Sequence, residues 1–341
     1  MADRVALRSP YFITRTALAT AQSVVCQIWI EGALKYTLLK SVTAGQSVYF
    51  EISELVRDYL VINYDGTPQR VNGVLGTEID FDVRIYFYPT TDGTGNALSP
   101  SYVQDGNDGF DAYGYFDEGA NWIPPYPLSF SASWLIAPKL GTNTDWEIFV
   151  PENKSGYLPY ILFNGSKPQV DYASYNGTQN SVTIGVGVTC TINRLPCSKY
   201  EPQRITFVNK YGQFQDLWFA LKKVLTTSTT KEEYQGINLT SSGSTTTYAT
   251  NKSTKVVYNK EATERISLNS GYYPEGYNAV FEQLLESEQI WIQTLNAVGT
   301  TQYLPLNVIT SSFTKKTKLN DKLIDYTIEF AEAYDKINNV R

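Results

Sequence analysis

The chain has 341 residues, of which 42% are hydrophobic and only 18% are charged, and its net charge is −6. This length allows two or three domains with their own cores, and the abundance of Ser, Thr, Asn, Gly and Tyr favours strands with uncharged polar faces. Histidine is absent, which excludes Ser-His-Asp and Cys-His nucleophiles, histidine-ligated zinc and the usual general base near neutral pH.

The N-terminal part is predicted to form a β-sandwich. Every second residue is apolar over residues 24–30, 48–52 and 81–87, a period of two that is typical of half-buried strands. Ser53 is expected to cap a short helix over residues 54–60, and Pro89 is expected to end the last of these strands. The size and pattern indicate a sandwich of the immunoglobulin or fibronectin kind.

Residues 90–127 show no period and are rich in Gly, Asp, Asn and aromatic residues. A structureless loop of this length is unusual in a compact domain and normally has a function. Aromatic rings among small polar residues are typical of a binding loop. The candidate contact residues are Tyr113, Tyr115, Phe116, Trp122 and Tyr126. The loop either binds a partner or cell-surface sugar, or it packs against its own subunit.

Strand-like sequence resumes near Phe130 and is clearest over residues 182–192. We expect it to complete the N-terminal sandwich or to form a second small sheet. Residues 1–195 are therefore predicted to be the N-terminal β-sandwich domain, with the aromatic loop as an insertion. Pro196 marks the predicted domain boundary.

Residues 196–341 are predicted to be a β-rich C-terminal domain. It is expected to begin with a hairpin over residues 205–219 and to contain one helix at about 275–288, with Pro274 in its first turn. Residues 226–254 are almost wholly Ser, Thr, Asn, Gly and Tyr, which predicts an extended arm or surface strands. A final hairpin is expected from residues 312–318 to a strand over residues 324–330. The fold class is thus mainly β, with two or three β-sandwich-like domains, a few short helices and long loops.

The sequence indicates no catalytic residue, metal or cofactor. It contains no phosphate-binding glycine motif, and its three cysteines make no disulfide framework, although Cys190 and Cys197 could meet across a turn. Residues 105–111, DGNDGFD, hint at calcium but depart from the EF-hand pattern, so a turn-rich loop is expected. Two carboxylates suffice for glycoside hydrolysis, and Asp111, Asp117 and Glu118 keep a carbohydrate-cleaving enzyme as a minor alternative.

Neither nucleic acid nor membrane is an expected partner. The notable basic cluster, Lys315, Lys316, Lys318 and Lys322, is too short to neutralise many phosphates and is interpreted as a solvated guard of a sheet edge. The N-terminus lacks a signal-peptide pattern, and no apolar run approaches the ~20 residues that a membrane-spanning helix needs. We expect synthesis in a cytoplasm.

Several segments resemble virion proteins of tailed phages that infect Bacteroidetes and marine bacteria. The segment from Cys197 to Phe219, with RITFVNKYGQFQDLWF, resembles one in that group, as do LLESEQIWI, LPLNVITSSF and KLNDKLIDYTIEFAEAY near the C-terminus. A strand ending in IEFAEA is similar to the end of distal-tail and tail-hub proteins. SPYFI and YFEISELVRDYL fit the β-sandwich opening of the group.

The resemblance implies a non-enzymatic structural protein of the phage tail. We expect a tail-tip, baseplate or neck component that forms a symmetric oligomer and connects tail parts, with other virion proteins as partners and the virion tail as its location. Strands with uncharged polar faces suit such a role because they can pair between subunits. The alternatives are a receptor- or carbohydrate-binding tail protein that uses the aromatic loop on host-surface carbohydrate, and a capsid decoration protein.

Overall fold

The computed structural model describes residues 4–68, 70–71, 74–75, 77–114, 133–135, 146–164, 167–184, 188–195, 199–317, 323–334 and 336. The fold is mainly β, as the sequence predicted, and consists of several sheets with short helices. The described part contains two α-helices, α1 (Ser53–Arg57) and α2 (Asn278–Glu286), and a 3₁₀ turn, η2 (Glu275–Tyr277), leads into α2.

The N-terminal part is a five-stranded sheet packed against a two-stranded ribbon and α1. The sheet has the order β1-β9-β8-β3-β4, and β1 runs parallel to β9. Its strands are β1 (Arg4–Ala6), β3 (Ser23–Ile30), β4 (Ala33–Ser41), β8 (Glu78–Tyr88) and β9 (Leu98–Phe110), and the ribbon pairs β2 (Phe12–Thr16) with β5 (Ser47–Glu51). The alternating apolar residues of β3, β5 and β8 form one buried cluster, so the three strands predicted here are confirmed.

The segment expected to be a long loop contains the strand β9. It pairs with β8 through two register shifts and with β1 on its other side. Side-chain amides hold its irregular part, since Gln104 Nε2 donates to Asn107 Oδ1 at 2.8 Å and Asn107 Nδ2 donates to the Phe81 carbonyl at 3.2 Å. The prediction of a structureless loop is therefore wrong for residues 98–110, because pairing on both sides overrides a sequence without strand periodicity.

Ser53 does not cap α1, contrary to expectation. The N-cap position is Ile52, which makes no side-chain capping bond. The Ser53 hydroxyl instead donates to Glu51 Oε1, the oxygen that also accepts the Ser53 backbone N–H at 2.9 Å. The carboxylate of Glu51 thus satisfies the start of this short helix from outside it.

Two three-stranded sheets lie between the N-terminal part and the C-terminal sheet in sequence. One has the order β10-β12-β13 and the other β11-β15-β14, in which β11 and β15 are parallel. Their strands are β10 (Ser133–Leu135), β11 (Trp146–Pro151), β12 (Gly156–Asn164), β13 (Lys167–Tyr175), β14 (Ser181–Ile184) and β15 (Val188–Leu195). Buried residues of these sheets share one cluster with the C-terminal strands, whereas the sequence interpretation grouped residues up to 195 with the N-terminal sandwich.

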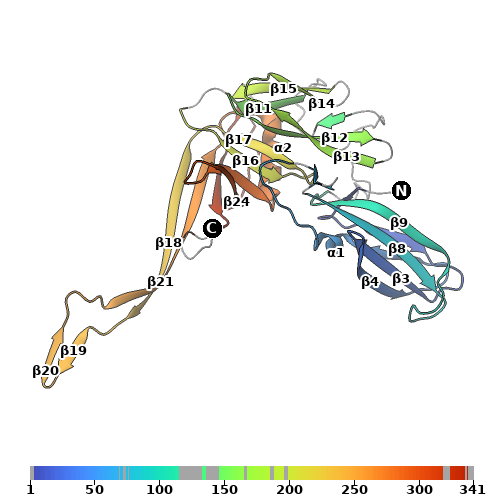
Figure 1. The fold of residues 1–341 in the computed structure, drawn as a ribbon, viewed down its shortest axis with the longest axis horizontal. Helices are drawn as coiled ribbons and strands as arrows, with labels where there is room; N and C mark the ends of the chain where they lie inside the picture. Colours follow the sequence, from blue (N-terminus) through green and yellow to red (C-terminus); the bar gives the residue numbers. More distant parts are fainter. Residues whose placement is uncertain are drawn as a thin grey trace.

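The C-terminal part is built on an antiparallel seven-stranded sheet with the order β17-β16-β23-β24-β26-β21-β18 (Figure 1). Its strands are β16 (Gln203–Val208), β17 (Phe214–Phe219), β18 (Lys223–Gln235), β21 (Lys255–Asn269), β23 (Ile290–Leu295), β24 (Thr301–Val308) and β26 (Thr327–Glu332). The predicted hairpin β16–β17 and the predicted helix α2 are both confirmed. Phe281 of α2 is fully buried and lies edge-on to Phe219, with ring centroids 6.4 Å apart.

The final hairpin predicted from the sequence does not form in the described residues. Residues 309–317 form no strand, and β26 pairs with β21 and β24 instead. The alternating apolar residues from Ile324 to Phe330 are nevertheless buried as expected. Three short pairs complete the fold: β6 (Arg70–Val71) with β7 (Val74–Leu75), β22 (Tyr273–Pro274) with β25 (Leu323–Ile324), and β19 (Leu239–Ser242) with β20 (Thr245–Tyr248).

Candidate functional site

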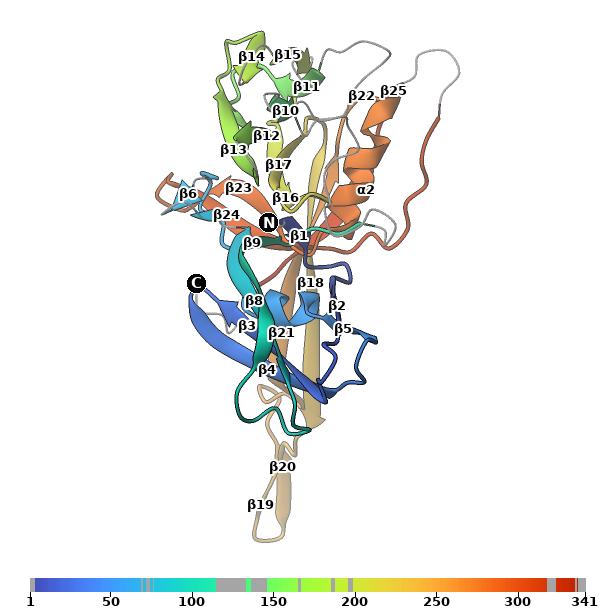
Figure 2. The same cartoon turned by 90° about the vertical axis from the view of Figure 1, so that its right-hand side faces the viewer.

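A two-stranded arm projects from the edge of the seven-stranded sheet. It consists of β18 and β21, which pair from Lys223↔Leu268 to Gln235↔Lys255, and of the β19–β20 hairpin at its end. Figure 1 shows the arm extending away from the body, and in Figure 2 it passes behind the N-terminal sheet with its β19–β20 end projecting below. The segment expected at residues 226–254 from its Ser and Thr content is thus the outer part of a longer hairpin.

The arm is exposed on both faces. Every residue of β19 and β20 is exposed, and so are nearly all residues of β18. Large apolar side chains of the arm are exposed as well: Tyr248 (67%) and Leu239 (60%) in the end hairpin, and Ile237 (87%) just before it. An isolated two-stranded ribbon is marginally stable in water, and exposed apolar side chains gathered on one element are typical of an interaction surface.

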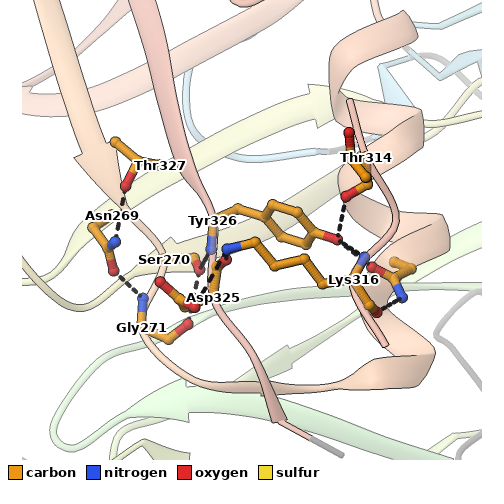
Figure 3. Close-up of polar contacts among 9 residues, drawn as sticks. Asn269, Ser270, Gly271, Thr314, Lys316, Asp325, Tyr326 and Thr327 are labelled. Carbon is orange, nitrogen blue, oxygen red and sulfur yellow. Dashed lines mark hydrogen bonds and ion pairs between the residues drawn. The ribbon is translucent and has the colours of Figure 1, made fainter. Parts of the chain in front are cut away.

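A polar cluster fixes the root of the arm (Figure 3). Where β21 ends, Asn269 Nδ2 donates to Thr327 Oγ1 at 2.9 Å and the Ser270 hydroxyl accepts the Tyr326 N–H at 2.9 Å. The Tyr326 hydroxyl accepts the Lys316 N–H at 2.8 Å and donates to Asn278 Oδ1 of α2 at 2.5 Å. These bonds join β21 to β26 and α2, so the arm leaves a rigid base.

Of the five aromatic residues proposed as contacts, the structure describes one. Tyr113 lies against the C-terminal part, where its hydroxyl bonds the Glu286 carboxylate and its N–H donates to the Lys210 carbonyl at 3.1 Å. The Arg8 guanidinium lies over its ring, 5.0 Å from the centroid. Burial, followed by the bond to Glu286, raises the pKa of Tyr113 above its usual range. Tyr115, Phe116, Trp122 and Tyr126 lie outside the described residues.

Ion pairs surround Tyr113 at the junction of the N-terminal and C-terminal parts. Arg57 Nη2 lies 2.5 Å from Glu288 Oε2, and Arg57 Nε lies 3.4 Å from Asp111 Oδ1. Burial raises the pKa of Asp111 although Arg8 and Arg57 lower it. An open cavity of about 250 Å³ adjoins these residues and is lined by Arg57, Asp58, Leu60, Ile62, Asp111, Glu288 and Gln289. Arg57 pairs with two of the three carboxylates that line the cavity, those of Asp111 and Glu288, so we interpret the cavity as part of the contact between the two parts.

The acidic segment 105–111 belongs to β9 and its immediate end. Asp105 lies 4.0 Å from Arg84, and Asn107 is fully buried with its amide bonded inside the sheet. No group of three or more Cys, Asp or Glu side chains among the described residues is placed to hold a metal ion. Asp117 and Glu118, the partners considered for Asp111 in a glycosidase, lie outside the described residues.

A buried ion pair, which the sequence interpretation missed, lies between β16 and β17. Arg204 Nη2 is 2.6 Å from Asp216 Oδ2, and the two side chains are 6% and 5% exposed. Asp216 also accepts the Thr206 hydroxyl at 2.7 Å and the Tyr157 N–H at 3.1 Å. Burial opposes the charge on Arg204, but Asp216 raises its pKa above the ordinary value. Arg204 directly precedes the strand that the sequence predicts from residue 205. Its position next to a buried strand was the available signal for a buried charge.

Tyr64, which follows α1 in the chain, contacts the Arg204–Asp216 ion pair. Its hydroxyl accepts Arg204 Nη2 at 3.1 Å, and its ring lies 4.8 Å from Phe214 and 5.4 Å from Trp291, measured between centroids. Gly66 has a φ of 99°, and a Cβ there would lie 2.0 Å from the Tyr303 ring, so only glycine lets the chain pass. These contacts join the N-terminal part to the C-terminal sheet.

The cysteines that the structure describes are unreactive core residues. Cys26 and Cys190 are free and buried. Burial raises the pKa of each thiol to about 12, and a thiol of that pKa is a poor nucleophile near neutral pH. The possible bond between Cys190 and Cys197 is not formed, since Cys190 is free.

The most prominent feature of the described residues is thus an exposed arm that carries apolar side chains. None of the helices in the described ranges is long and apolar enough to cross a membrane. Comparison with known proteins adds no relative, because no protein-family model, no curated protein and no solved structure matches this chain.

Proposed function

We propose that this chain is a non-enzymatic structural subunit of a phage tail, a tail-tip, baseplate or neck component that forms a symmetric oligomer and connects tail parts. The observation that carries the proposal is the arm, which projects from a rigid base and exposes apolar side chains on both faces. Exposure of these side chains to water does not stabilise a monomer. Their burial against a neighbouring subunit would stabilise the assembly by about 25 cal/mol per Å² of apolar surface.

The placement in a virion rests on the resemblance of the hairpin β16–β17 and of the C-terminal segments to phage virion proteins. The physical features agree with that placement. The arm is uncharged over residues 236–254 except for Lys252, so it meets a neighbour with little desolvation of charge. The junction residues around Arg57 and Glu288 fix the N-terminal sheet relative to the arm's base, which a subunit that connects two neighbours requires.

Removing the outer arm is expected to abolish self-association without unfolding the chain. The variant replaces residues 231–260 by Asn-Gly, a two-residue turn that joins the directly paired residues Thr230 and Glu261. It keeps the bond from the Lys336 N–H to the Ala262 carbonyl at 2.8 Å. Sedimentation over a range of concentrations should give an oligomer for the full chain and a monomer for the variant.

The control removes exposed apolar side chains elsewhere. Leu295→Thr with Val298→Thr changes another exposed hairpin and is expected to leave the oligomer intact. A shortened variant that retains the mass of the full-chain oligomer would contradict the role of the arm. Mass spectrometry of purified phage particles tests the virion assignment separately, and a chain that assembles but is missing from particles would overturn that part.

A further inference from the structure

The outer edge of β18 is open along its whole length. In the seven-stranded sheet β18 is the terminal strand, so among the described residues no strand pairs with its outer side. The opposite edge of the arm is partly covered, since β26 pairs with residues 265–269 of β21 and the Lys336 N–H donates to the Ala262 carbonyl. The arm therefore presents one long unpaired edge.

This edge is regular and has few of the features that prevent strand addition. The register shift in the arm puts the extra residue, Tyr258, on β21, so β18 itself carries no bulge. Between Val224 and Thr230 the strand has neither charge nor proline, whereas exposed edges in monomeric proteins are usually guarded by both.

The hydrogen bonds at the two ends of the arm show which residues face outward. The Asn269 N–H donates to the Lys222 carbonyl at 3.1 Å, and the Gly236 N–H donates to the Thr254 carbonyl at 2.7 Å. Residues that bond inward alternate along an antiparallel strand, so even-numbered residues of β18 bond to β21. The odd-numbered residues, among them Leu225, Thr227 and Thr229, direct their N–H and C=O groups to the open edge.

The sequence of this edge is complementary to itself. Residues 226–230 read Thr-Thr-Ser-Thr-Thr, a palindrome centred on Ser228. If two copies pair antiparallel about that centre, Thr227 faces Thr229 of the second copy and Thr226 faces its Thr230. Threonine pairs across strands are favourable. The same register matches odd with odd residues, as pairing of two identical edges about a two-fold axis requires.

Charges at the ends of the palindrome fit the same register. Lys223 comes to face Glu233 of the second copy, and its own Glu233 faces the second copy's Lys223. Leu225, 54% exposed, faces Lys231, whose alkyl chain can cover it. Burial lowers the pKa of Lys223, more than Glu264 and Glu332 raise it, so a further carboxylate beside this ammonium is favourable.

We propose that two copies of this chain join through antiparallel pairing of their β18 edges, with Ser228 facing Ser228, to form a four-stranded ribbon β21-β18-β18-β21. The inference names the partner of the arm and so rests on the proposed function only in taking the arm as an assembly element. It implies an assembly built from pairs of subunits. The shortened variant, whose arm ends at Thr230, would lose the pairs that Lys231 and Glu233 make with the second copy and would keep only residues 226–230 in mutual pairing, too few to hold two copies together.

Disulfide trapping tests the register directly, in the full chain with Cys197→Ser, which leaves Cys26 and Cys190, both buried, as the only other thiols. Ser228→Cys should form a covalent dimer under mild oxidation, because directly opposed residues in a non-hydrogen-bonded pair have Cα atoms about 4.5 Å apart, within disulfide range. Thr226→Cys and Thr230→Cys should each remain uncrosslinked alone and should crosslink when mixed, because they face one another.

A second variant tests the edge without a thiol. Thr227→Pro removes an outward N–H and leaves the bonds to β21 in place, so it should leave the melting temperature nearly unchanged and abolish the dimer. Ser228→Cys crosslinking no faster than Thr226→Cys would overturn the proposed pairing. If the cysteine variants do not crosslink as predicted but the shortened arm still abolishes assembly, this inference is wrong and the proposed function stands. If neither Thr227→Pro nor the shortened arm affects assembly, both are wrong.

Discussion

Replacing Arg204 by alanine is expected to lower the free energy of unfolding by about 3–5 kcal/mol. The substitution leaves the Asp216 carboxylate, which is 5% exposed, without its cation. Asp216 would keep the Thr206 hydroxyl and the Tyr157 N–H as donors, but neutral donors do not compensate a buried charge. Urea denaturation monitored by tryptophan fluorescence measures the change.

The double variant Arg204→Met with Asp216→Asn serves as the control. Methionine approximates the volume of the arginine stem, and the asparagine carbonyl can still accept the bonds from Thr206 and Tyr157. Replacing both partners of a buried ion pair is often close to neutral, so the double variant should recover most of the lost stability. A single variant within about 1 kcal/mol of the parent would show that the pair is not buried as described.

Replacing Tyr64 by alanine is expected to cost about 3–5 kcal/mol and to uncouple the N-terminal part from the C-terminal sheet. The ring fills a cluster with Phe214, Trp291 and Tyr303, and the residue connects α1 to that cluster. Loss of the ring leaves a cavity at the contact between the two parts. Unfolding followed by far-ultraviolet circular dichroism and by tryptophan fluorescence should then give transitions that no longer coincide.

The matched variant Tyr64→Phe keeps the ring and removes only the hydroxyl that bonds Arg204 at 3.1 Å. The hydroxyl also accepts the Thr206 hydroxyl at 3.4 Å and donates to the Gly66 carbonyl at 3.3 Å. Its loss, dominated by the bond to the charged Arg204, should lower stability by about 1.5–3 kcal/mol, and the two parts should still unfold together. If alanine and phenylalanine at this position have equal effects, the aromatic contacts contribute nothing and do not join the two parts.

The periodicity of apolar residues in the sequence predicted the strands and the helix that bury one face. Alternation identified β3, β8 and β26, and the apolar pairs of residues 280–285 identified α2, because burial on one side imposes that pattern. Composition without a period predicted the arm, since strands exposed on both faces have no reason to alternate. The strand β9 escaped prediction because its partners, β8 and β1, are distant in sequence and supply its order through the Gln104 and Asn107 side chains.

The candidate site was predictable only in part. The Ser- and Thr-rich composition of residues 226–254 predicted an extended arm or surface strands, but the open edge of β18 follows from the strand order of the whole sheet. The Arg204–Asp216 pair depends on register between two strands and on a tyrosine from a segment 140 residues away. The aromatic residue at 113 was chosen for its composition, and the structure places it at an internal junction, where it bonds Glu286.

Hydrogen–deuterium exchange of the arm, compared between the isolated chain and the assembled oligomer, tests the central claim most directly. Residues 224–250 are mostly exposed in the single chain, and their amides should exchange quickly there even where they pair within the arm, because an isolated ribbon opens readily. The account predicts marked slowing of exchange across this segment on assembly. Exchange that stays equally fast in the oligomer would show that no neighbour completes the arm.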